Sequence, residues 1–283
     1  MRRAAGFTLV ELVIVIVLLA ILSISVFSYL GLGARIFQDT VARDTQAWES
    51  RFALQRFSRE ARNALPSSLR VSADGACLEM VPIIASSAYL ALPSLGNSNL
   101  ALSPPTLLTT QYQDNSALFI FVAANSNRRV YEANASQRVS VDAGDIPASS
   151  SQPWLIDTGN QPFQRSSPGR RYYLTSNPVS WCIVADSPSR GRLVRYANYN
   201  QGFANLTTNP SDAPSVAQLD SLIANNAQRV VMANDIVPNL SGFSQLSATL
   251  NRNSLVLLDL TVGSTGSEEI LSLYHEVHIP NVP

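Results

Sequence analysis

The sequence contains no lysine, and arginine supplies all twenty of its basic side chains. Charged residues make up only 14% of the chain, and twenty acidic residues balance the arginines to a formal net charge of zero. A protein that binds nucleic acid or an anionic surface through bulk charge carries a basic excess, so this balance argues against both. The arginines are scattered along the chain, which favours codon bias over a set of anion ligands.

The sequence also has little that indicates catalysis. It has no glycine-rich phosphate loop, no repeat of fixed period and no glycine-flanked serine elbow. His275 and His278 stand three apart in an expected strand, so they should face opposite sides and cannot share a metal there. Asp142 and Asp145 in "VDAGDI" can offer oxygen ligands to calcium, but such pairs are more typical of turns. We expect no catalytic residue, no metal site, no cofactor and no enzymatic activity.

Cysteine is scarce as well, since the chain has only Cys77 and Cys182. Each lies in a short apolar, strand-like context, "ACLEMV" and "SWCIVA". In an exported chain an isolated pair predicts one disulfide bond, whereas in a cytosolic chain it predicts two buried thiols. The choice therefore depends on whether the chain is exported.

The N-terminus contains a long apolar run. Residues 12–22 are apolar without interruption, and the whole of residues 7–30 admits only Thr8, Glu11 and three serines. As a helix these residues would span roughly 36 Å, enough to cross a hydrocarbon core of about 30 Å. The arginines at positions 2 and 3 should keep the N-terminus in the cytoplasm and place the rest of the chain outside.

Two kinds of processing are compatible with such a run. An ordinary signal peptidase could cut at "LGLGA", residues 30–34, but the run is too long and begins with a charge. The stretch "GFTLVELVIVIVLL" instead resembles the class III leader of type IV pilins and pseudopilins. This resemblance implies cleavage by prepilin peptidase after Gly6, N-methylation of the new N-terminus at Phe7, and a role for Glu11 in subunit assembly. A plain signal anchor with an accidental glutamate is the alternative.

A second helical segment is expected over residues 36–65, which lack proline and glycine and precede Pro66. Gly31 and Gly33 predict a kink or a melted joint before it. Its apolar residues form two stripes on nearly opposite faces: Val41, Trp48 and Phe52, then Leu54, Phe57, Ala61 and Leu65. In the pilin architecture one stripe would pack on a β-sheet and the other would face neighbouring subunits. Alternatively, a single domain wraps around the helix.

From Leu69 onward the pattern changes to short β-like runs separated by Ser, Asn, Pro and Gly. The runs are "LRVS", "CLEMVPIIA", "LFIFVA", "RRVYEA", "RYYLT", "VSWCIVA", "RLVRYA", "RVVMA", "LVLLDLTV" and "ILSLYHEVHI". Residues 86–105 and 142–169 are expected to form long polar loops. The fold class is α+β, with one long N-terminal helix on a mostly antiparallel sheet.

The expected organisation is a leader at residues 1–6, a transmembrane and polymerisation helix at 7–30, an amphipathic helix at 31–65 and a β-rich periplasmic domain at 66–283. The segment "PVSWCIVADSPSRGRLVRY" is similar to the hairpin of the PilW/GspJ-like group of larger minor pilins and pseudopilins. Other segments, including the terminal "EVHIPNVP", are similar to biogenesis proteins of mannose-sensitive haemagglutinin (MSHA) pili.

The resemblance implies a set of partners and a location. The partners are other major and minor pilins, prepilin peptidase, the inner-membrane assembly platform and membrane lipid, without nucleic acid. The chain would cross the inner membrane once and then enter a pilus. The rivals are a GspJ-like pseudopilin of type II secretion, a membrane-anchored binding protein or adhesin that never polymerises, and an enzyme tethered by a signal anchor.

Overall fold

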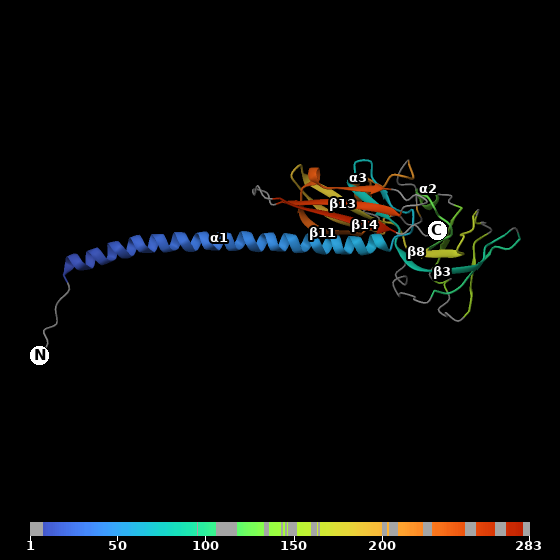
Figure 1. Ribbon diagram of the computed structural model, residues 1–283, viewed down its shortest axis with the longest axis horizontal. Coiled ribbons are helices and arrows are strands. Elements are labelled where there is room, and N and C mark those ends of the chain that lie inside the picture. Colours follow the sequence, from blue (N-terminus) through green and yellow to red (C-terminus); the bar gives the residue numbers. More distant parts are fainter. Residues whose placement is uncertain are drawn as a thin grey trace. The chain divides into compact units, whose positions relative to one another are not determined.

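The computed structural model describes residues 8–94, 96–105, 118–132, 136–142, 144, 146, 152–159, 163, 165–199, 203, 209–222, 228–246, 253–263 and 270–279. The chain divides into two units, one up to Trp48 and one from Glu49 onward. Helix α1, Leu9–Arg62, contributes to both, and all the strands belong to the second unit (Figure 1). The fold is therefore α+β: a long apolar N-terminal helix followed by an antiparallel β-sheet domain.

Helix α1 continues through Gly31 and Gly33, so the prediction of a melted joint at these residues is wrong. Each glycine costs about 1 kcal/mol relative to alanine. Both lie far inside a helix of 54 residues, where each further residue adds a hydrogen bond without the cost of a new nucleus. The cost of two glycines is therefore too small to stop the helix.

Helix α1 ends at Arg62, earlier than the expected end at Leu65. The backbone N–H of Asn63 donates to the carbonyl of Glu60 at 3.1 Å, which tightens the last turn. The N–H of Leu65 then donates to the carbonyl of Val81 at 2.8 Å. The chain leaves the helix because its backbone groups find partners at Val81 and Ile83.

The larger sheet has eight strands, all paired antiparallel. They are β1 (Arg70–Val71), β2 (Cys77–Met80), β9 (Val179–Ser187), β10 (Arg190–Ala197), β11 (Gln228–Ile236), β12 (Gly242–Leu246), β13 (Ser254–Gly263) and β14 (Ile270–Ile279). Their order is β1-β2-β9-β10-β11-β13-β12, and β14 also pairs with β13. The expected hairpin over residues 178–196 is confirmed as β9 and β10.

The smaller sheet has six strands in the order β6-β5-β8-β3-β4-β7, again antiparallel. They are β3 (Ile83–Ala91), β4 (Asn99–Leu102), β5 (Leu118–Phe121), β6 (Arg138–Val141), β7 (Trp154–Asp157) and β8 (Arg171–Thr175). The prediction of long loops is wrong in part. Strands β3 and β4 occupy part of residues 86–105, and β7 lies within residues 142–169. Trp154 and Leu100 are fully or almost fully buried there, so these segments contribute to a core.

One expected strand is a helix. Residues of "RRVYEA" form α2, Asn127–Tyr131, after Ser126 at the N-cap position. Its burial explains the difference, because Val130 and Tyr131 pack into a small apolar cluster with Phe119, Phe121 and Phe203. The remaining short helices are α3 (Val216–Ser221) and the 3₁₀ helix η4 (Pro238–Leu240).

The main hydrophobic core lies between α1 and the larger sheet. Leu54, Phe57 and Ala61 of the second expected stripe are buried against it. The ring of Phe57 meets that of Trp181 on β9 edge to face, with centroids 5.6 Å apart. A separate core fills the smaller sheet around Trp154 and Tyr172.

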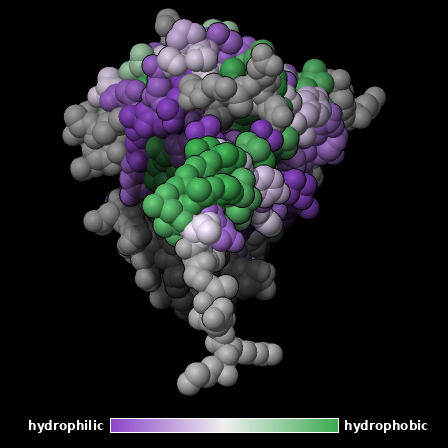
Figure 2. Space-filling model, turned by 90° about the vertical axis from the view of Figure 1, so that its left-hand side faces the viewer, coloured by the Kyte–Doolittle hydropathy of each residue, from purple (hydrophilic) through white to green (hydrophobic). Residues whose placement is uncertain are grey.

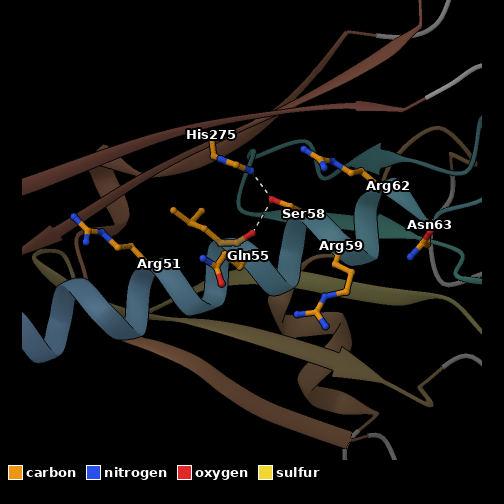
Figure 3. A pocket seen from close by; sticks show the side chains of 8 residues that line it. Arg51, Gln55, Ser58, Arg59, Arg62, Asn63 and His275 are labelled. Atoms are coloured by element: carbon orange, nitrogen blue, oxygen red, sulfur yellow. Dashed lines mark hydrogen bonds between the residues drawn. The ribbon is translucent and has the colours of Figure 1, made fainter.

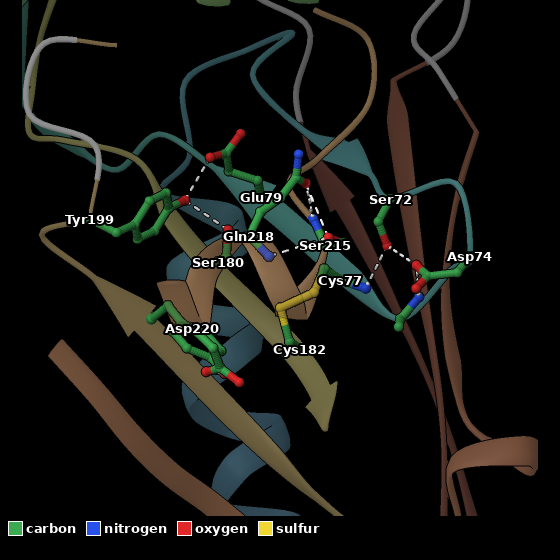
Figure 4. The surroundings of a disulfide bond; sticks show 12 residues. Ser72, Asp74, Cys77, Glu79, Ser180, Cys182, Tyr199, Ser215, Gln218 and Asp220 are labelled. Atoms are coloured by element: carbon green, nitrogen blue, oxygen red, sulfur yellow. Dashed lines mark hydrogen bonds between the residues drawn. A yellow bond between two sulfur atoms is a disulfide. The ribbon is translucent and has the colours of Figure 1, made fainter. Parts of the chain in front are cut away.

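A disulfide bond joins Cys77 on β2 to Cys182 on β9 (Figure 4). The two residues are direct partners in the antiparallel ladder. Both are fully buried beside Val194 and Tyr196. The bond therefore ties two neighbouring strands that are 105 residues apart in the sequence.

Candidate functional site

The first turn of α1 contains a hydrogen bond between the Thr8 side chain and the backbone of Glu11. The Thr8 hydroxyl accepts a hydrogen bond from the backbone N–H of Glu11 at 3.3 Å. The Thr8 carbonyl accepts from Leu12 at 3.2 Å, which is the first bond of the helix. Thr8 is thus the N-cap and Glu11 the third helical residue, in the Thr-x-x-Glu spacing of a capping box. A carboxylate is favoured here because the N-terminal end of a helix carries partial positive charge.

Beyond Glu11 the helix presents a continuous apolar surface. Its large aliphatic side chains from Leu12 to Leu32 are all exposed, and hydrophobic colour covers this part of the molecule in Figure 2. The hydroxyls of Ser23 and Ser25 donate to the carbonyls one turn earlier, at 2.7 and 3.2 Å, so these polar groups are satisfied within the helix. By length and composition, α1 can cross a membrane. Glu11 is the only charged side chain between Thr8 and Gly33.

Further along α1 the two apolar stripes differ in exposure. Phe57 is fully buried, whereas Phe52 is 58% exposed. Val41 and Trp48 are exposed as well. The buried stripe packs on the domain's own sheet, whereas the other stripe is exposed.

Polar contacts also fix α1 to the larger sheet. The Glu60 carboxylate accepts from the Trp181 indole N–H at 2.9 Å and from Arg195 at 3.0 Å. On another side of the helix, the Ser58 hydroxyl is hydrogen-bonded to the imidazole of His275 on β14 (Figure 3). Because these bonds supplement the apolar core, the helix from Glu49 onward has a defined position on the sheet.

A buried charged cluster lies next to the disulfide (Figure 4). Arg70 forms an ion pair with Glu79, and these side chains are 3% and 0% exposed. The Tyr199 hydroxyl donates to Glu79 at 2.6 Å and is hydrogen-bonded to Ser180 at 2.7 Å. The guanidinium of Arg70 also stacks on the Tyr131 ring, 3.6 Å from its centroid. Every member is partnered, as a buried charge requires.

The same cluster shifts the pKa values of its members. Burial, together with the charge of Glu79, raises the pKa of Tyr199 well above its usual value. Burial likewise raises the pKa of Tyr131. Burial alone would lower the pKa of Arg70, but Glu79 and the two tyrosines raise it overall. The arginine is therefore held charged and both phenols neutral, which is typical of a structural ion pair.

The residues predicted from the sequence fall in different places. Gly6 and Phe7 lie outside the described residues, as does Asp145, while Asp142 is exposed. His275 and His278 both lie on β14 and face opposite sides: His275 points to α1 and His278 is exposed. In the described part of the chain no group of three or more His, Cys, Asp or Glu residues is placed to hold a metal ion.

Two features escaped the sequence analysis. The capping interaction of Thr8 had a signal, namely the Thr-x-x-Glu spacing ahead of an apolar run. The ion pair of Arg70 with Glu79 had none, because the chain has many arginines and nothing in their spacing shows which of them become buried.

The comparisons with known proteins agree with the N-terminal geometry. Residues 1–27 match the family model of the prokaryotic N-terminal methylation motif. The match supports a type IV pilin-like protein. No curated protein and no solved structure matches the chain.

Several general properties accompany the pilin-like motif. Proteins with this motif are generally structural rather than enzymatic. They generally assemble with other pilins. The motif and the apolar helix are together consistent with anchoring in a membrane.

Proposed function

We propose that this chain is a non-enzymatic minor pilin of an MSHA-like type IV pilus, most similar to MshO, that takes part in pilus assembly. Prepilin peptidase cleaves it after Gly6, and Phe7 becomes the methylated N-terminus. The globular domain lies in the periplasm until the subunit is drawn into the fibre with other pilins by the inner-membrane platform. The similarity of the terminal "EVHIPNVP" and other segments to MSHA biogenesis proteins supports this choice within the superfamily.

The observation that carries the proposal is a single carboxylate at the start of an exposed helix that carries no other charge up to Gly33. A carboxylate at the centre of a membrane helix costs about 2.5 to 3.5 kcal/mol, and less near its end. Glu11 lies in the first turn, where the helix dipole offsets part of this cost. A membrane anchor needs no such residue, so we attribute it to recognition of a cation.

Cleavage after Gly6 would create that cation, the amine of Phe7. In the family's assembly scheme the glutamate of an entering subunit pairs with the amine of the subunit ahead of it. Opposite charges attract strongly in a low-dielectric environment, so this pair can set the axial register while the apolar flanks pack without specificity. A subunit that leads the fibre has no subunit ahead of it. Because this chain has Glu11, we infer that it enters behind another minor pilin.

The central experiment replaces Glu11 by leucine in the native host. E11L should be made, inserted and cleaved like the wild type, because the change makes the helix more apolar. It should fail to crosslink to other pilins or to support pilus initiation. Val10→Leu, one residue away on the same turn, is the matched control and should assemble normally. Normal pilus numbers with E11L, or crosslinks that place the subunit at the extreme tip, would contradict the proposal.

A second experiment tests the processing. Mass spectrometry of the purified wild type should find N-methylated phenylalanine at Phe7. Gly6→Val should leave a full-length precursor in the membrane, because the peptidase requires a small residue before the cut. A mature N-terminus near Ala34 would indicate ordinary signal peptidase and would remove the pilin interpretation. Loss of exoprotein secretion with intact pili in E11L cells would instead assign the chain to a type II secretion pseudopilin.

A further inference from the structure

A groove of about 570 Å³ runs between α1 and the edge strand β14. Figure 3 shows Arg51 and Arg62 on either side of the contact between Ser58 and His275, with Gln55 and Arg59 along the open side of the helix. The residues that line the groove are Arg51, Leu54, Gln55, Ser58, Arg59, Arg62, Asn63 and His275. No proposal above uses this site.

The three arginines follow one face of the helix. Arg51, Gln55 and Arg59 are four residues apart, and Arg62 is eleven residues after Arg51, so all lie within a narrow angular range. At 1.5 Å per residue, Arg51 and Arg59 are about 12 Å apart along the axis and Arg51 and Arg62 about 16 Å. The groove therefore carries a row of positive charge that is longer than a single small anion.

The charges in this row lack the partners that other arginines have. At least seven arginines elsewhere in the described chain form ion pairs with Asp or Glu. Arg51, Arg59 and Arg62 have none among the described residues, and no acidic side chain lines the groove. Like charges gathered in a hollow repel one another and raise the local potential. An anionic occupant would relieve this repulsion.

Features beside the arginines favour a polypeptide over a phosphate or a lipid. Strand β14 pairs with β13 on one side, and no described strand pairs with its other side. Its exposed backbone groups can accept an added strand. The amides of Gln55 and Asn63 can donate to and accept from a peptide backbone. The bond between Ser58 and His275 fixes the wall of the groove in advance.

We propose that this groove binds an extended, acidic segment of another protein. The carboxylates of the segment pair with Arg51, Arg59 and Arg62 while its backbone pairs with the free edge of β14. Four residues of extended chain cover about 13 Å, close to the spacing of Arg51 and Arg59. Carboxylates on alternate residues of the segment would therefore lie within reach of the arginines that line the groove. The site goes beyond the proposed function and does not depend on entry into a pilus.

The test uses the full chain in a non-ionic detergent and a fluorescent peptide of alternating Glu and Val, eight residues long. Anisotropy should show binding that weakens as salt is raised, and a Gln/Val peptide should bind far less. The triple variant R51Q/R59Q/R62Q should raise the Kd by at least about tenfold. The matched control R165Q/R170Q/R171Q removes the same charge from exposed arginines elsewhere and should change it by less than about twofold.

Further probes decide between the classes of partner. A peptide with N-methyl groups on alternate residues keeps its carboxylates but cannot pair with a strand edge, so it should bind weakly. Equal loss in both triple variants would show bulk charge and overturn the proposal. The proposal would also be overturned if the three arginines bound an anionic oligosaccharide or phosphatidylglycerol vesicles and the acidic peptide did not bind. Failure of E11L to assemble would bear on the pilus function alone.

Discussion

At the scale of single residues, the buried ion pair of Arg70 and Glu79 makes the sharpest prediction. Glu79→Gln would leave the guanidinium of Arg70 buried without a counter-charge, and breaking such a pair costs about 3 to 5 kcal/mol. The Tyr199 hydroxyl would also lose its charged acceptor. Urea titration of the full chain in detergent should show this loss in the free energy of unfolding.

The control for this prediction is Glu132→Gln. Glu132 forms an i,i+4 pair with Arg128, whose side chain is 77% exposed. Surface pairs of this kind contribute little to stability. If E79Q were as stable as E132Q, the pair of Arg70 and Glu79 would not be a structural element of the domain.

Single residues also show the limit of sequence reasoning. The place of Glu11 in the first turn follows from its neighbours Thr8 and Leu9, because capping is a local interaction. The hydrogen bond between Ser58 and His275 joins residues 217 apart in the sequence. Nothing in the spacing of either residue indicates that pairing, so the sequence predicted His275 on a strand but not its partner.

At the scale of the helix, the two apolar stripes should respond differently to truncation. Phe57→Ala removes a fully buried ring that meets Trp181, and such a change costs about 3 to 5 kcal/mol. Phe52→Ala, five residues earlier and 58% exposed, should change stability by less than about 0.5 kcal/mol. Thermal unfolding of the two variants side by side measures this difference.

The same pair of variants separates the two interpretations of the helix. If the exposed stripe of Val41, Trp48 and Phe52 faces neighbouring subunits, F52A should be stable yet assemble poorly. If instead one domain wrapped around the helix, F52A would lose as much stability as F57A, contrary to its exposure.

Secondary structure was predictable wherever apolar periodicity and turn residues agreed. The long β-like runs near the C-terminus became β13 and β14. The run "RRVYEA" became α2, in which Val130 and Tyr131 both reach one apolar cluster, whereas neighbouring residues on a strand point to opposite faces. The i,i+4 pair of Arg128 and Glu132 was the available helical signal.

At the scale of the whole molecule, the disulfide should be a major stabiliser of the domain. Replacing Cys77 and Cys182 together by alanine should lower the free energy of unfolding by about 2 to 4 kcal/mol. Thiol labelling of the unreduced, denatured wild type should fail at both positions. Labelling of both would show free thiols and would weaken the case for export.

The division into two sheets could not be read from the sequence. Apart from β3, the strands of the smaller sheet have only four or five residues, and their segments carry the same polar spacers as the rest of the chain. Which sheet a strand joins depends on long-range pairing, such as that of β3 with β8. Local patterns therefore gave the fold class, whereas the topology needed the structure.

The position of the smaller sheet in the chain affects the order in which the strand pairs of the larger sheet form. The chain leaves the larger sheet at Met80 and returns at Val179, and these two residues face each other in the ladder. The whole smaller sheet is thus an insertion whose ends are neighbours. Closing so long a loop is entropically costly and slow, whereas the hairpins of β9 with β10 and of β13 with β14 form from adjacent segments.

A chain delivered to an oxidising compartment N-terminus first would therefore expose Cys77 well before its partner, which follows 105 residues later. During that interval the thiol can react only with an outside disulfide. The mixed disulfide so formed would be released when Cys182 arrives and displaces it. If the chain is exported, an oxidoreductase that reacts with Cys77 before Cys182 has emerged would therefore stay covalently bound to the chain until then.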